Sequence, residues 1–129
     1  MRVLIVESCD NLARIWQNHL KRLGMDVIRA QGQKEAIAYL GTDVIDMIIL
    51  DLVLQDGSAL AVADYASYRL PDARVIFVTN TSFFSDGSIF SLVPNACAFV
   101  RTGTPPEDLA ALVEHYGGDH RASSGMGAA

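Results

Sequence analysis

The sequence predicts an α/β domain whose doubly wound parallel sheet has five strands in the order 2-1-3-4-5. Short apolar runs, many of them rich in β-branched residues, recur at residues 2–6, 25–30, 45–50, 75–79 and 96–101. Segments of helical periodicity separate these runs, which indicates alternating strands and helices. The runs are almost continuously apolar, as in parallel strands that helices cover on both faces. Right-handed crossovers between such strands give the doubly wound arrangement.

Apolar stripes and terminal signals mark most of the helices. The first helix carries a stripe with helical spacing, formed by Leu12, Ile15, Trp16, Leu20 and Leu23. Asp10 or Asn11 is its candidate N-cap, and Gly24 ends it. The second and third helices are centred on smaller sets: Ala36, Ile37 and Leu40, closed by Gly41, and Leu60, Ala63 and Ala66, which follow a turn at residues 56–58. The last helix starts with Thr104 as its N-cap and buries one face, formed by Leu109, Leu112, Val113 and Tyr116.

The segment between Thr81 and Pro94 predicts a short fourth helix that is rich in Ser and Gly. It also carries more large apolar residues than one buried stripe can use, namely Phe83, Phe84, Ile89, Phe90 and Leu92. We therefore expect an exposed apolar patch beside the fifth strand and the fifth helix, through which the protein docks a partner or forms a two-fold homodimer. In the competing interpretation, an irregular loop folds these aromatic residues inward.

Length and composition restrict the domain organisation and the class of protein. The chain has 129 residues, of which 50% are apolar and 19% charged, and its net charge is −5. We expect one globular domain at residues 1–116 and a flexible C-terminal tail at residues 117–129. The acidic balance argues against nucleic-acid binding, and no apolar run is long enough to span a membrane, so we expect a cytoplasmic protein. The two cysteines, Cys9 and Cys97, do not form a disulfide framework, and the scattered histidines offer no zinc site.

Candidate functional residues follow the strands at their carboxyl ends, where ligands bind in open α/β sheets. Glu7 and Ser8 follow the first strand, and Asp51 follows the third. Because these strands are neighbours in the predicted order, Glu7 and Asp51 should converge. Asp51 also interrupts an apolar run, which costs free energy unless its side chain faces the open edge of the sheet. Two carboxylates suit Mg2+, and an aspartate beside such a cation can accept a phosphoryl group.

A flavin-binding protein of the same topology is a weaker alternative. Its first loop would need backbone N–H groups from a Gly- or Ser-rich segment to surround the phosphate. The loop at residues 7–11 has no glycine and contains two acids, Glu7 and Asp10, which repel an anion.

Five segments of the chain, in order, carry a specific pattern: residues 3–7 (VLIVE), 46–57 (DMIILDLVLQDG), 75–79 (VIFVT), 96–100 (ACAFV) and 106–109 (PEDL). On these segments the chain resembles, from residue 2 to residue 116, the receiver domain of bacterial two-component response regulators, a CheY-like, flavodoxin-like fold. The resemblance implies that Asp51 is the phospho-acceptor and that Glu7 and Asp51 hold Mg2+, with Ser8 as a weaker ligand. It also implies that Thr79 is the hydroxyl that bonds the phosphoryl group, and that Phe99 is the aromatic switch residue.

Two departures from the family pattern remove charges from the site. The family has two adjacent acids after the first strand, whereas the second position here is Ser8. It also ends the fifth strand with a Lys-Pro pair, where this chain has Thr102 and Gly103. Arg101 stands one position before Thr102, so it should point to the other face unless the strand end bulges. We therefore expect weaker Mg2+ binding and a weaker response to phosphorylation.

Two functional hypotheses remain open. In the first, the chain is a single-domain receiver that takes a phosphoryl group on Asp51 from a histidine kinase or a histidine phosphotransfer protein. It then signals through the face formed by the fourth helix, the fifth strand and the fifth helix. In the second, it is an atypical receiver that docks or dimerises without phosphorylation. Neither makes it an enzyme, beyond its own phosphorylation and dephosphorylation.

Overall fold

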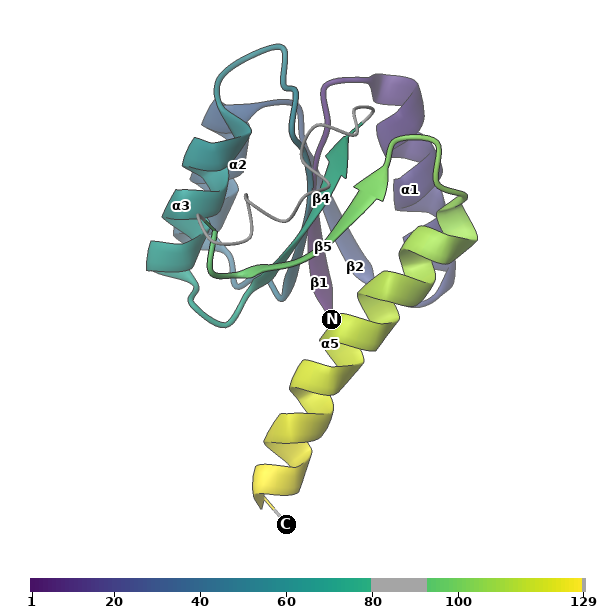
Figure 1. The fold of residues 1–129 in the computed structure, drawn as a ribbon, viewed down its shortest axis with the longest axis vertical. Helices are drawn as coiled ribbons and strands as arrows, with labels where there is room; N and C mark the ends of the chain where they lie inside the picture. Colours follow the sequence, from purple (N-terminus) through teal and green to yellow (C-terminus); the bar gives the residue numbers. More distant parts are fainter. Residues whose placement is uncertain (80–92, 129) are drawn as a thin grey trace.

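The computed structural model describes residues 1–79 and 93–128, and from residue 118 onward it describes the backbone alone. Its five parallel strands form one sheet in the order β2-β1-β3-β4-β5, as predicted (Figure 1). The strands are β1 (Arg2–Val6), β2 (Asp26–Ala30), β3 (Met47–Asp51), β4 (Arg74–Thr79) and β5 (Ala96–Arg101). The described helices are α1 (Asp10–Arg22), α2 (Gln33–Thr42), α3 (Ala59–Arg69) and α5 (Pro106–Ala128).

Helices cover both faces of the sheet, α2 and α3 on one side and α1 and α5 on the other (Figure 1). Successive residues of each strand alternate between the two sides. In β1, for example, Leu4 and Val6 pack toward α2 and α3, whereas Val3 and Ile5 pack toward α1 and α5. Beyond Arg2 and Arg74, which begin β1 and β4, the central strands are therefore apolar until they reach the carboxyl edge, where Glu7 and Thr79 are buried polar side chains.

The buried faces of α1 and α3 differ from the predicted stripes. Ile15 of α1, Leu60 of α3 and Leu23, the C-cap of α1, are exposed. Ala13 and Val62, which lie outside the predicted stripes, are buried in these helices instead. Small residues on the sheet-facing side let the helix backbone approach the sheet closely, so the larger neighbours are left at the margin.

Two of the predicted N-caps are wrong. Cys9 is the N-cap of α1, and its side chain makes no capping bond, while Asp10 is the first helical residue and pairs with Arg29. Helix α5 begins at Pro106, one residue later than a cap at Thr104 requires. In contrast, Ser58 caps α3 as a serine at that position should, by accepting a hydrogen bond from the Ala61 N–H.

Two predicted segments, the fourth helix and the C-terminal tail, differ in what the structure describes of them. The fourth helix and its five large apolar residues lie within residues 80–92, outside the described part of the chain. Helix α5 continues to Ala128, so residues 117–128, which the sequence assigns to a flexible tail, are helical and extend past the end of the sheet (Figure 1). The division at residue 116 remains a prediction. No helix in the described ranges is long and apolar enough to cross a membrane.

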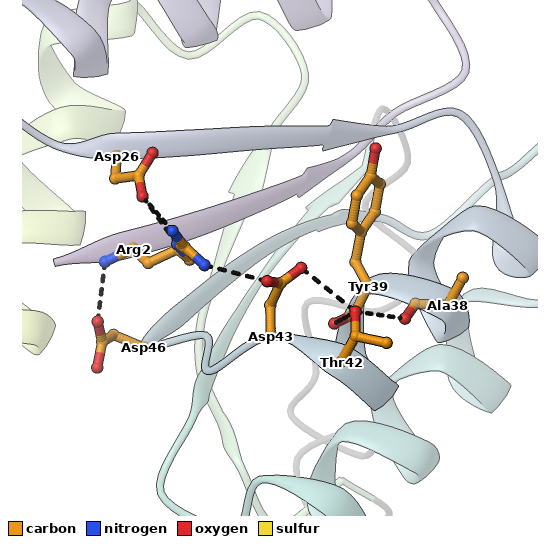
Figure 2. A network of polar contacts seen from close by, with 7 residues as sticks. All are labelled: Arg2, Asp26, Ala38, Tyr39, Thr42, Asp43 and Asp46. Atoms are coloured by element: carbon orange, nitrogen blue, oxygen red, sulfur yellow. Dashed lines mark hydrogen bonds and ion pairs between the residues drawn. The ribbon is translucent and has the colours of Figure 1, made fainter.

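A network around Arg2 closes the amino end of the sheet (Figure 2). The Arg2 guanidinium pairs with Asp26 at 2.7 Å and with Asp43 at 3.2 Å, and the Arg2 backbone N–H donates to Asp46. These contacts tie β1 to β2 and to the connection between α2 and β3. They also give three acids a structural partner far from the carboxyl edge of the sheet, where Glu7 and Asp51 lie.

Candidate functional site

Glu7 and Asp51 converge at the carboxyl edge of the sheet, as predicted. Val6 of β1 lies level with Leu50 of β3, so the next residues, Glu7 and Asp51, leave their strands at the same height. Both continue the alternation that places Ile5 and Ile49 on the side of α1 and α5. The two carboxylates therefore share one side of one edge.

Glu7 is an unusual residue for a strand end because it is only 2% exposed. Its Oε2 accepts a hydrogen bond from the Cys9 N–H at 3.3 Å, but its Oε1 is buried without a partner in the described part of the chain. Burial, and after it the neighbouring Asp51 carboxylate, raise the pKa of Glu7 to about 7.

This arrangement fits a divalent cation bound by two protein carboxylates. A buried, unpartnered carboxylate oxygen beside a second carboxylate is stabilised when a cation neutralises both. The described residues contain no group of three or more acidic, histidine or cysteine side chains that could hold a metal ion. A Mg2+ ion held by the Glu7 and Asp51 carboxylates would keep several of its waters.

The loop after Asp51 orients its carboxylate. The Val53 N–H donates to Asp51 Oδ1 at 2.9 Å, and the Leu52 N–H donates to the Val78 carbonyl at 2.9 Å. The first bond fixes the rotation of the Asp51 side chain, and the second holds the start of the loop against β4. The Asp51 carboxylate is partly exposed, so it remains reachable from solvent.

Thr79 ends β4, the neighbour of β3, and Thr102 follows the last residue of β5, which lies on the other side of β4. Thr79 is 5% exposed and lies one residue beyond Val78, which is level with Asp51. The Thr102 N–H donates to the Thr79 carbonyl at 2.9 Å, so the residue at the family's lysine position stands beside Thr79. Arg101 is level with Thr79 and is exposed.

A bulge in β5 sets the position of Phe99. Ala96 is level with Val75 and Ala98 with Ile76, so Cys97 is the extra residue. The bulge thus lies at the start of the strand and not at Arg101. Beyond it, Phe99 is level with Phe77, and the two rings stack with centroids 5.1 Å apart. Phe99 packs on the side of α2 and α3.

The Ser8 side chain bonds to two neighbouring loops. Its hydroxyl donates to the Gln31 carbonyl at 2.9 Å and accepts from the Gln55 N–H at 3.0 Å. A hydroxyl has one hydrogen and two lone pairs, so one lone pair remains for a weak metal contact.

Arg29 is a residue that the sequence analysis missed. Its guanidinium donates to the Glu7 carbonyl through Nε and Nη2, at 3.2 and 2.8 Å, and pairs with Asp10 through Nη1 at 2.6 Å. It thereby fastens the loop between β1 and α1 to β2. The signal for Arg29 in the sequence was a charged side chain near the end of a mostly apolar strand run, residues 25–30.

Comparison with known proteins identifies the family of this chain. The family model of the response regulator receiver domain matches residues 3–113. The chain belongs to this family. The receiver domain described here is similar to the response regulator protein PilR of Pseudomonas aeruginosa, with 30% identity over 113 residues, which is 88% of the chain and 24% of PilR. It is also similar to the luminescence regulatory protein LuxO of Vibrio campbellii, with 31% identity over 75 residues, 58% of the chain and 17% of LuxO.

Solved structures share the fold of this receiver domain. A CheY-like receiver domain protein from Methanospirillum hungatei superimposes with a TM-score of 0.86 at 22% identity, covering 95% of this chain and 97% of that one. The Thermotoga maritima response regulator TrrA, solved in complex with Mg2+-BeF, has a TM-score of 0.78 at 23% identity, covering 89% and 97% of the two chains. The receiver domain spans less than a quarter of the length of PilR and of LuxO.

Proposed function

We propose that this receiver domain works in two-component signalling by accepting a phosphoryl group on Asp51 from a histidine kinase or a histidine phosphotransfer protein. The observation that carries the proposal is the pairing of Asp51 with the buried Glu7 carboxylate at the carboxyl edge of the sheet. Such a pair is costly without a cation, and it lies where the family performs phosphoryl transfer.

The chemistry assigns one role to each residue. An Asp51 carboxylate oxygen attacks the phosphorus, the P–N bond to the donor histidine breaks, and the released imidazole nitrogen takes a proton from water. Glu7 and Asp51 would hold Mg2+, which supplies charge neutralisation for the transferring phosphoryl group. The Val53 N–H on Asp51 Oδ1 keeps the nucleophile in one rotamer. The product is an acyl phosphate, a mixed anhydride. Its hydrolysis restores the free Asp51 carboxylate.

The response to phosphorylation runs through Thr79. Its hydroxyl would donate to a phosphoryl oxygen, and the movement would be transmitted through the neighbouring strand to Phe99, which stacks on Phe77. Thr102 replaces a lysine that would make a charge-assisted bond, so the phosphorylated state gains less from this position. We expect a smaller shift between the two states than in receivers with the lysine.

The output is a protein contact on the face that includes β5 and α5. The apolar residues 83, 84, 89, 90 and 92 precede β5 in the chain and would contribute to it. A downstream protein or a second copy of the chain is the proposed partner.

Incubation with acetyl phosphate and Mg2+ tests the proposal. Intact mass should show one added phosphoryl group, and the addition should disappear when EDTA removes the metal. A chain that takes up no phosphoryl group from acetyl phosphate or from phosphohistidine donors would instead be a phosphorylation-independent docking module.

A further inference from the structure

Three backbone N–H groups of the loop between β3 and α3 donate hydrogen bonds to three different side chains. The Val53 N–H bonds to Asp51 itself. Further along, the Gln55 N–H donates to Ser8 Oγ at 3.0 Å, and the Ser58 N–H donates to Gln33 Oε1 at 2.8 Å. Two of these acceptors belong to other parts of the fold, Ser8 to the connection between β1 and α1 and Gln33 to the start of α2, so the loop that follows Asp51 depends on its neighbours for its position.

Ser8 is the point at which three connections meet. It lies between β1 and α1, while Gln31 lies between β2 and α2 and Gln55 lies between β3 and α3. One hydroxyl joins all three, because it donates to the Gln31 carbonyl and accepts from the Gln55 N–H. A carboxylate at this position could accept from Gln55, but in its ionised form it could not donate to Gln31. The two hydrogen bonds therefore require a side chain that both donates and accepts, as the Ser8 hydroxyl does.

Close packing beside Ser8 leaves the loop little freedom to adapt. Gly57 has a φ of +91°, and a Cβ at this position would lie 2.3 Å from the Gln33 side chain. The Gln33 N–H donates to the Asp56 carbonyl at 3.1 Å. The loop is therefore pressed against the start of α2, and the Ser8 bond fixes its other half.

Arg29 holds Ser8 itself in place. Its guanidinium donates to the carbonyl of Glu7 at 2.8 Å and reaches the carbonyl of Ser8 at 3.4 Å. Arg29 is also paired with Asp10, so its charge is balanced. The backbone that presents the Ser8 hydroxyl is thus anchored to β2.

We propose that Ser8 is a positioning residue: its hydroxyl fastens the loop after Asp51 to the connections on either side of β1. The proposal rests on the proposed function, since positioning matters for phosphoryl transfer to Asp51. Under this proposal Ser8 has a role of its own and is more than the replacement of a metal-binding acid. The geometry of the acceptor loop is maintained by hydrogen bonds, whether or not a cation is bound.

Hydrogen exchange tests the fastening without any phosphorylation. The bonds of Ser8 are solvent-exposed, so the Gln55 amide should exchange about tenfold faster in Ser8→Ala, which removes its acceptor. Ser8→Thr keeps the hydroxyl and should restore the protection. Thr42→Ala, which removes an exposed hydroxyl at the opposite end of α2 (Figure 2), should leave the Gln55 amide unchanged. Equal exchange of Gln55 in the wild type and Ser8→Ala would overturn the proposal.

Labelling by acetyl phosphate then separates positioning from metal binding. Ser8→Ala should lower the rate of phosphoryl uptake several-fold at saturating Mg2+, with the half-saturating Mg2+ concentration unchanged. A higher half-saturating concentration with a normal maximal rate would make Ser8 a metal ligand and contradict the proposal. If the wild type takes up no phosphoryl group, the proposed function fails, and the exchange of Gln55 alone decides whether Ser8 fastens the loop.

Discussion

The carboxylate of Glu7 is buried beside that of Asp51, and the pKa of Glu7 rises to about 7 as a result. Burial is the largest cause of the rise, and the neighbouring Asp51 carboxylate adds to it. The ordinary value of 4.5 applies to the unfolded chain. The folded protein therefore binds a proton on Glu7 between about pH 4.5 and pH 7 that the unfolded chain has released.

This pKa difference predicts a pH-dependent stability. Because the folded state binds more protons in that window, the free energy of unfolding falls as the pH rises from about 4.5 to about 7, by up to ~3 kcal/mol from this group. Glu7→Gln should flatten the dependence, measured by urea unfolding at pH 5 and pH 8 in EDTA. Glu114→Gln, at an exposed position of α5, is the matched control. If the wild type and Glu7→Gln lose the same stability between the two pH values, Glu7 is not the titrating group.

Adding a carboxylate at position 8 should strengthen metal binding. Ser8→Asp restores the second acid of the family pattern, and we expect it to bind Mg2+ more tightly in a calorimetric titration, by about tenfold. An unchanged affinity would mean that a side chain at position 8 is directed at Gln31 and Gln55 and does not reach the cation.

The stacked pair of Phe77 and Phe99 should contribute to stability. Phe99→Ala removes a ring that packs on Phe77, and we expect it to lower the free energy of unfolding by about 1–3 kcal/mol. Tyr68→Ala is the control, because Tyr68 is 83% exposed and its removal should change stability by less than about 0.5 kcal/mol. Equal effects of the two substitutions in urea unfolding would show that Phe99 is not held against Phe77 in solution.

Self-association should depend on the apolar residues that precede β5. Light scattering at high protein concentration should show a dimer for the wild type and a smaller species for Phe84→Ser or Phe90→Ser. A wild type that stays monomeric, with the same partners retained in a pull-down by both variants, would exclude this face as a contact surface.

Local patterns predict most of this fold because the strands are apolar on both faces. The same patterns predict the buried helix faces less well, since Ala13 in α1 and Val62 in α3 pack against the sheet although both lie outside the predicted stripes. The N-cap of α1 is mispredicted because Asp10 pairs with Arg29, a residue of β2 that is distant in sequence. The bulge at Cys97 has no glycine to mark it.

One part of the candidate site could be predicted from the sequence, and another part could not. Convergence of Glu7 and Asp51 follows from strand order alone, so the sequence predicts it. The partners of Ser8 lie 23 and 47 residues away along the chain, in loops whose positions depend on tertiary packing. No local pattern contains that information, and the resemblance to the family emphasises the acid that Ser8 replaces.

The most direct test of the account compares the intact masses of the wild type, Asp51→Asn and Asp56→Asn after incubation with acetyl phosphate and Mg2+. All three should be folded, and Asp51→Asn should be as stable as the wild type or slightly more so, because it relieves the repulsion with Glu7. The account predicts one added phosphoryl group on the wild type and on Asp56→Asn, and none on Asp51→Asn. Uptake by Asp51→Asn at the wild-type level, or no uptake by the wild type, would contradict it.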